Sequence, residues 1–275
     1  MFRQLARRRL MIGVTAALCG VVLGTAVTTA FAQSVDEIKK KGTLTVGMLV
    51  DFPPYGTVDG SNMPDGYDAD VAKLLAKEWG VKLDLVPVTG PNRIPFLLTN
   101  KVDLLIASFS PTPERAKQVQ FSRPHSAATI VLFGQKKLAI KSPADLKGVR
   151  VAVARASTQD QALTAIAPEG TEIRRFDDDA SAMQALMSGQ VDALGCATTV
   201  AAQIAKRVPD TYENKLVLRQ QFMAPTMRLG QADLLKGVNS FIAKNVDNGE
   251  LNRLYKKWLQ TELPVMPAAS LPAIN

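Results

Sequence analysis

The chain has 275 residues, with 33 lysines and arginines, 25 aspartates and glutamates, and a formal net charge of +8. Residues 1–32 hold four of the basic residues and none of the acids, so the remaining chain has a net charge of only +4. This balance leaves no basic stripe and argues against nucleic acid as a partner. One histidine and one cysteine after residue 32, Cys196, cannot form an internal disulfide or a Cys/His zinc site. We therefore expect no metal and no cofactor.

Residues 1–32 have the pattern of an export signal. An arginine-rich start is followed by an apolar stretch, and Ala30-Phe31-Ala32 gives the small-x-small cleavage pattern. The alternative is an uncleaved membrane anchor, and the run of arginines also permits a twin-arginine route. No later apolar run reaches membrane-spanning length. We expect a cleaved signal peptide over residues 1–32 and an exported, periplasmic protein.

The next hundred residues alternate between predicted strands and helices. Strands are predicted at 43–50, 82–88 and 102–106, each with an apolar pattern. A helix with Asp68 as its N-cap should end at Gly80, and a short helix is predicted around 92–100. This alternation is typical of an α/β fold with parallel strands.

Polar side chains follow the apolar strand at 102–106 directly. Ser108, Ser110 and Arg115 lie beyond its carboxyl end, where open α/β sheets bind ligands. A guanidinium flanked by hydroxyls can hold a carboxylate through two parallel hydrogen bonds. The segment therefore predicts one half of an anion site. The alternative for Arg115 is a surface ion pair, with Asp103 as its partner.

A second half of the chain repeats the first. Residues 146–153 resemble 41–47, and residues 190–194 resemble 101–105 in the same order. Two similar βαβ units are the simplest explanation. In the second unit, Ser157 or Thr158 should cap a helix whose free N–H groups face the crevice between the units.

Several short motifs carry a resemblance that covers essentially the whole chain after residue 32. They are Asp51-Phe52-Pro53-Pro54-Tyr55, Gly66-Tyr67-Asp68-Ala69-Asp70, Thr112-Pro113-Glu114-Arg115, Phe121-Ser122-Arg123-Pro124, Asp145-Leu146-Lys147-Gly148, Ser157-Thr158, Asn248-Gly249-Glu250-Leu251 and Tyr255-Lys256-Lys257-Trp258. In this order and spacing the chain resembles the periplasmic solute-binding proteins of polar amino-acid ABC transporters, extracellular solute-binding family 3.

The resemblance implies an α/β fold of two doubly wound lobes joined by a two-crossing hinge, like the type II periplasmic binding proteins. Lobe 1 would take residues 33–127 and 226–275, and lobe 2 residues 128–225. The implied function is capture of a small carboxylate-bearing solute between closing lobes, without catalysis. The implied partner is an ABC transporter permease, and we expect a monomer.

The family's ligand-binding positions in lobe 1 fall on particular residues. Arg115 matches the arginine that holds the ligand's α-carboxylate. Ser108 and Ser110 match positions that hydrogen-bond the ligand, and Phe52 matches the aromatic residue that packs on it.

Two further matches concern lobe 2 and the far end of the ligand. Ser157 and Thr158 match the pair at a helix start that completes carboxylate binding. The stretch around Arg93 resembles the one that presents an arginine to the distal carboxylate in binders of acidic amino acids.

One position departs from the family pattern. The aspartate that usually pairs with the ligand's α-ammonium is replaced by Ala197, and a buried ammonium without a counter-charge is costly. Either Asp51 or Asp68 substitutes, or the ligand carries no amine. With Arg93 and Arg155 able to face the cleft, the sequence favours an acidic amino acid or a dicarboxylate as ligand.

The main alternative is an enzyme on the same fold, a cyclohexadienyl- or arogenate-type dehydratase. Such an enzyme needs a general acid or base in the cleft. Glu172 and Asp160 are candidates, but neither stands on a catalytic motif, so we predict no catalytic residues. His125 is predicted to be half-buried near the hinge, and Cys196 to be a buried apolar residue on the cleft floor.

Overall fold

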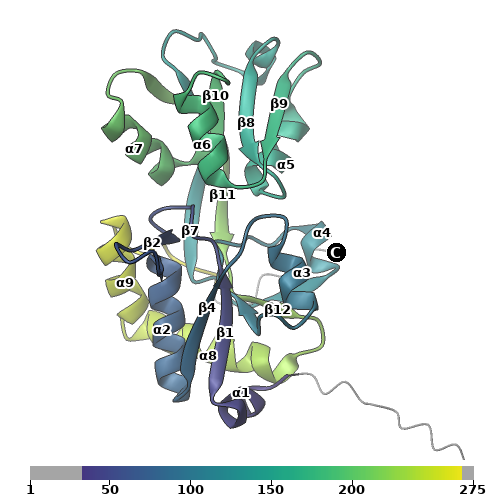
Figure 1. Cartoon of the computed structure of the whole chain (residues 1–275), viewed down its shortest axis with the longest axis vertical. Helices are drawn as coiled ribbons and strands as arrows, with labels where there is room; N and C mark the ends of the chain where they lie inside the picture. Colours follow the sequence, from purple (N-terminus) through teal and green to yellow (C-terminus); the bar gives the residue numbers. More distant parts are fainter. Residues whose placement is uncertain (1–32, 268–275) are drawn as a thin grey trace, which may run out of the picture. The chain divides into compact units, whose positions relative to one another are not determined.

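The computed structural model describes residues 33–267, so the predicted signal peptide at 1–32 lies outside the described residues. The described chain contains two five-stranded mixed sheets (Figure 1). In the described part of the chain, no helix is both long and apolar enough to cross a membrane.

The first sheet has the strand order β4-β1-β5-β12-β6. Its strands are β4 (Lys82–Pro87), β1 (Thr43–Met48), β5 (Leu104–Leu105), β12 (Thr226–Arg228) and β6 (Val119–Phe121). The helices that accompany it are α1 (Val35–Lys41), α2 (Tyr67–Trp79), α3 (Arg93–Leu98), α4 (Pro113–Ala116), α8 (Ala232–Asp247) and α9 (Glu250–Leu259). A short hairpin of β2 (Thr57–Val58) and β3 (Pro64–Asp65) precedes α2.

The second sheet has the strand order β11-β7-β10-β8-β9. Its strands are β11 (Tyr212–Met223), β7 (Ser126–Gln135), β10 (Ala193–Ala197), β8 (Arg150–Ala154) and β9 (Glu172–Phe176). The helices of this part are the 3₁₀ helix η1 (Pro143–Leu146), α5 (Thr158–Ile166), α6 (Asp179–Met187) and α7 (Thr198–Arg207).

The repeat predicted from the sequence is confirmed by the two sheets. In each sheet three parallel strands are arranged alike, as β4-β1-β5 and β9-β8-β10, with the first of the three along the chain lying between the other two. The aspartate in each repeated motif also has the same contact. Asp103 accepts a hydrogen bond from the Thr45 N–H at 2.8 Å, and Asp192 accepts one from the Arg150 N–H at 3.1 Å. Each aspartate therefore ties its own strand to the first strand of the unit.

The chain passes between the sheets twice, from β6 to β7 and from β11 to β12. Beside these crossings, β7 and β11 pair antiparallel from Ser126↔Met223 to Gln135↔Tyr212. Tyrosines fix the start of β7. The hydroxyls of Tyr55 and Tyr255 donate to the Ala127 carbonyl at 2.6 and 3.1 Å.

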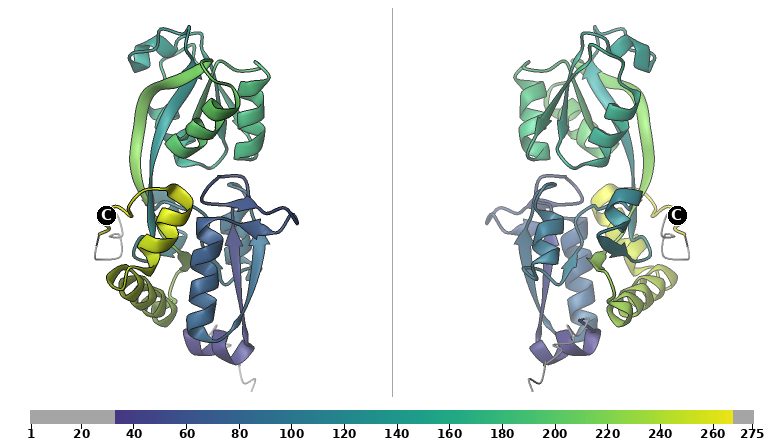
Figure 2. Two further views of the ribbon diagram at one scale, coloured as in Figure 1. Left: turned by 90° about the vertical axis from the view of Figure 1, so that its left-hand side faces the viewer. Right: turned by 90° about the vertical axis from the view of Figure 1, so that its right-hand side faces the viewer.

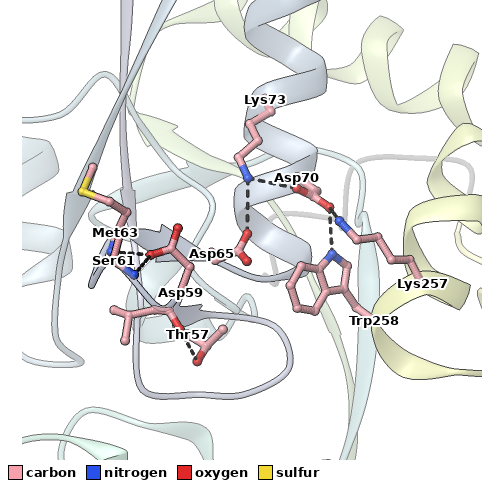
Figure 3. A network of polar contacts seen from close by, with 10 residues as sticks. Thr57, Asp59, Ser61, Met63, Asp65, Asp70, Lys73, Lys257 and Trp258 are labelled. Atoms are coloured by element: carbon pink, nitrogen blue, oxygen red, sulfur yellow. Dashed lines mark hydrogen bonds and ion pairs between the residues drawn. The ribbon is translucent and has the colours of Figure 1, made fainter.

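Helices α8 and α9 pack together, and α9 also contacts α2 (Figure 2). Asp70 of α2 holds this last contact, because its Oδ2 accepts hydrogen bonds from Trp258 Nε1 at 2.8 Å and Lys257 Nζ at 2.6 Å (Figure 3). Burial alone would raise the pKa of Asp70, but the bonds from Lys257, Trp258 and Lys73 outweigh it and lower the pKa. Asp70 and Trp258 thus join two helices.

The predicted N-cap of α2 is wrong. The helix begins at Tyr67 after Gly66, whose φ of 119° favours glycine. Asp68 lies inside the first turn and is fully buried. Its side chain bonds to groups outside the helix, so tertiary contacts and not capping explain why an aspartate stands there.

Candidate ligand-binding site

A cavity collects most of the predicted ligand-binding residues. Its lining residues come from strand ends, loops and helices of both sheets: Leu49, Phe52, Gly90, Arg93, Ser108, Arg115, Ala154, Arg155, Ser157, Thr158, Gln159, Asp179 and Gln221. Of the seven predicted residues, only Ser110 does not line it. The free volume is about 20 Å³, on the order of one water molecule. A solute larger than a water molecule can therefore enter only if groups that line the cavity move.

Arg115 is positioned by the short helix α4. Thr112, with extended backbone, caps the helix by accepting from the Arg115 N–H at 3.3 Å, and Pro113 starts it. The guanidinium is buried. It donates from Nη1 to the Ser110 carbonyl and from Nη2 to the Ala156 carbonyl, both at 2.6 Å.

Arg93 reaches the same carbonyl from α3. Its Nη2 donates to Ala156 at 3.1 Å and its Nη1 to the Ala107 carbonyl at 3.2 Å, whereas its Nε is buried without a partner. Only 4% of the residue is exposed. The Cζ atoms of Arg93 and Arg115 lie 4.0 and 4.2 Å from the centre of the Phe109 ring, which supplies a cation–π contact to each.

Neither guanidinium has a carboxylate partner among residues 33–267. Burial lowers the pKa of Arg93 to about 10. Burial also lowers the pKa of Arg115, and the neighbouring charge of Arg93 lowers it further. The alternative ion pair between Arg115 and Asp103 is wrong, because Asp103 pairs with Lys41 at 2.6 Å. The cavity therefore contains two buried positive charges whose hydrogen bonds go only to carbonyls, while Asp179 and Asp51 act on Arg93 through space and partly oppose the lowering of its pKa.

Ser108 follows β5 with a φ of 48°, in the left-handed region that few residues other than glycine adopt. Asp68 holds it there, since its Oδ2 accepts from the Ser108 N–H at 2.7 Å and from the Ser108 hydroxyl at 2.8 Å. The other oxygen of Asp68 lies 2.9 Å from His125 Nε2. His125 is fully buried, so the prediction of a half-buried histidine is wrong.

Ser157 and Thr158 lie where β8 passes into α5. Ser157 is the N-cap, and its hydroxyl accepts from the Asp160 N–H at 3.1 Å. Both residues are buried, and the first N–H groups of the helix have no partner within it. This helix start therefore offers donors to a negatively charged group in the cavity.

Two aspartates meet at the start of α6, and Asp179 was missed in the sequence. Asp51, from the loop after β1, accepts from the Asp179 N–H at 2.6 Å and the Ala180 N–H at 3.3 Å. Asp179 itself lines the cavity. Burial and the charge of Asp51 raise the pKa of Asp179, and the charge of Arg93 opposes them; the resulting pKa is about 8. No motif marks Asp179, because Asp177-Asp178-Asp179 reads as a simple helix-cap cluster.

The remaining candidates have other contacts. Phe52 lines the cavity and stacks on Tyr55, with ring centres 5.7 Å apart. Arg155 also lines it but pairs with the exposed Asp177 at 3.0 Å. Cys196 is buried but does not line the cavity. Glu172 and Asp160 pair with nearby arginines, and neither faces the cavity.

Among residues 33–267, no group of three or more histidine, cysteine, aspartate or glutamate side chains is placed to hold a metal ion. The arrangement offers positive charge, helix N–H groups and one acid of raised pKa. Such a cavity can hold a small anion with two acidic groups.

Comparison with known proteins gives one family. The sequence pattern of the bacterial extracellular solute-binding proteins, family 3, matches residues 44–261. The L-cystine-binding protein TcyJ of Escherichia coli (strain K12) is 29% identical over 261 residues, which cover 93% of this chain and 97% of that protein. The glutamine-binding protein of Geobacillus stearothermophilus is 34% identical over 210 residues, covering 74% and 78% of the two chains.

A solved structure is similar over most of the chain. The ancestral amino acid-binding protein AncCDT-1, a precursor of cyclohexadienyl dehydratase, has a TM-score of 0.74 and 38% sequence identity. The similarity covers 82% of this chain and 99% of that one. These relatives bind chemically different solutes according to their names, so they do not identify the ligand of this chain.

Proposed function

The chain belongs to the bacterial extracellular solute-binding proteins of family 3, and we propose that it captures an acidic amino acid or a dicarboxylate for delivery to an ABC importer. Residues 33–127 with 226–275 and residues 128–225 form two lobes that close on the solute. The signal at residues 1–32 directs the protein to the periplasm. It acts there as a monomer, without catalysis, with an ABC transporter permease as its partner.

The two buried arginines carry this proposal. Arg93 and Arg115 share the Ala156 carbonyl and have no acid within salt-bridge distance in the described chain. Asp179 and Asp51 act on Arg93 through space, but no acid among residues 33–267 bonds to either guanidinium. A buried charge without a directly bonded counter-charge costs roughly several kcal/mol, even after the surroundings relax. A ligand with two carboxylates would replace the shared carbonyl and give each guanidinium a negative partner.

The rest of the lining fits the same ligand. Ser157, Thr158 and the free N–H groups of α5 would bind one carboxylate from the opposite side to Arg115. Phe52 would pack on the carbon chain. The Ser108 hydroxyl donates its proton to Asp68, so it could only accept a hydrogen bond from the ligand. It would have to rotate away from Asp68 to donate one.

Calorimetric titration of the purified chain, freed of bound solute by unfolding and refolding, tests the proposal. Glutamate, aspartate, glutarate or succinate should bind, and glutamine, arginine and cystine should bind at least about 100-fold more weakly. Arg93→Met should abolish this preference for two carboxylates. Arg253→Met, which removes an exposed arginine paired with Glu250, should not. Binding of neutral or cationic amino acids alone would overturn the proposal.

A dehydratase is the second candidate function, and one observation favours it. Asp179 lines the cavity with a pKa of about 8, a value suited to proton transfer near neutral pH. Incubation with prephenate or arogenate distinguishes the two functions. We expect reversible binding or none, and formation of an aromatic product would establish the enzyme instead.

A further inference from the structure

We propose that Asp179 pairs with the α-ammonium group of the ligand, so that the ligand is an acidic amino acid and not an amine-free dicarboxylate. This inference rests on the proposed function and narrows it. Asp179 would thereby supply the counter-charge to the ammonium group. The end of β10 cannot supply it, because the buried residue there is Ala197.

The two acids suggested by the sequence are occupied elsewhere. Asp68 is fully buried, bonds to Ser108 and His125, and does not line the cavity. Asp51 holds the first N–H groups of α6 and does not line the cavity either. Among the described aspartates and glutamates, the cavity wall includes only Asp179.

The carboxyl of Asp179 has no structural task that explains it. The N-terminus of α6 is capped by others, because Asp51 accepts from two N–H groups and Asp178 accepts from the Ser181 N–H at 2.7 Å. Asp179 receives a single hydrogen bond, from Gln159 Nε2 to Oδ1 at 3.2 Å. Its Oδ2 is left for a donor in the cavity.

Charge balance connects this acid to the nature of the ligand. Among the charged residues that line the cavity, Arg155 is paired with Asp177, so Arg93 and Arg115 contribute two positive charges and Asp179 is the acid. Asp51 does not belong to the lining, and its carboxylate is held by the first N–H groups of α6. A glutamate-like ligand carries a net charge of −1, so the cavity is neutral when Asp179 is ionised. A ligand with two carboxylates and no amine neutralises the arginines by itself, so an ionised Asp179 opposes it and a protonated one does not.

The surroundings of Asp179 make its ionisation depend on the ligand. Asp51 faces it from the loop after β1, Arg93 from α3, Gln159 from α5 and the Cys196 thiol from β10, while Asp178 precedes it. Burial and Asp51 raise the pKa of Asp179 to about 8. A ligand ammonium favours the ionised carboxylate, so an acidic amino acid should bind more tightly as the pH rises from 6 to 8, and level off above. An amine-free dicarboxylate should bind more weakly over the same range.

The experiment compares matched ligands on matched variants by calorimetric titration. Glutamate is paired with glutarate, and aspartate with succinate. Asp179→Asn should lower the affinity for the amino acid by about 30-fold or more. The affinity for its amine-free partner should stay the same or increase. Asp178→Asn keeps a good N-cap and removes only the smallest of the influences that raise the pKa of Asp179, so it should change the ratio of the two affinities by less than about threefold.

A second measurement needs no variant. Titrations of the wild-type chain at pH 7, in buffers that differ in ionisation enthalpy, should show proton release with the amino acid and none with its amine-free partner. Equal proton counts, or an Asp179→Asn variant that weakens both ligands by the same factor, would overturn the role of Asp179 while leaving an acid-binding protein. Failure of the wild type to bind any of these acids would overturn the proposed function itself.

Discussion

Two groups of buried polar side chains come from the same stretch of the sequence, residues 68–125, and differ in how their members are bonded. Asp68 uses both of its oxygens on Ser108 and His125, accepting from the serine and lying against the imidazole Nε2, although Nδ1 of His125 has no partner among the described residues. Arg93 and Arg115 instead share one carbonyl, and the Nε of Arg93 has no partner. Buried polar groups that bond to one another stabilise the fold, whereas donors left over in a cavity are available to a ligand.

The largest effect is expected from Asp68→Ala, on stability. The substitution leaves the Ser108 N–H and His125 without their partner in a fully buried place, so the free energy of unfolding should fall by about 4 kcal/mol. Urea unfolding measures the change. Asp65→Ala, which removes a more exposed acid beside Lys73, should cost under about 1 kcal/mol. Equal losses in the two variants would show that the buried group is not a structural centre.

Arg115→Met should have the opposite profile. We expect affinity for the acidic ligand to fall about 30-fold or more, because a carboxylate loses its bidentate partner. The free energy of unfolding should stay the same or increase, because a buried charge without an acid is removed. Titration and urea unfolding of the same samples check both. If the free energy of unfolding fell by as much as the binding free energy, Arg115 would have a structural role like that of Asp68.

The smallest effect is expected from Ser110→Ala. The Ser110 hydroxyl is buried, makes no hydrogen bond and does not line the cavity. Stability should change by less than about 0.5 kcal/mol and ligand affinity by less than about threefold. Ser157→Ala serves as the comparison, since loss of that N-cap should cost about 1 kcal/mol. A tenfold loss of affinity in Ser110→Ala would instead support the ligand contact predicted from the sequence.

Much of the fold follows from short-range signals in the sequence. The two repeated units can be recognised in the sequence because each contains an aspartate that bonds the neighbouring strand. The same contact requires the same short motif in both units. The N-cap at Ser157 can be predicted from the sequence, because a serine between a strand and a helix can bond an N–H group only three residues away. Arg93 and Arg115 follow from the resemblance, and the structure brings both to one carbonyl.

The roles of the acids depend on distant parts of the chain. Asp68 looks like a helix cap because its partners, Ser108 and His125, are 40 and 57 residues away. Three consecutive aspartates, 177–179, stand at the start of α6, and Asp51 meets the helix N–H groups there while Asp179 lines the cavity. Local pattern cannot supply such contacts, because they arise only when segments distant in the sequence come together in the fold.

The buried thiol of Cys196 has a practical consequence. Burial raises its pKa, the charge of Asp179 raises it further, and it is the only cysteine after residue 32. Thiol-reactive dyes should therefore leave the native chain unlabelled. A single cysteine introduced at the exposed Asp177, close to the start of α6, would then be the only site modified, and its fluorescence would turn the protein into an optical reporter of its own ligand.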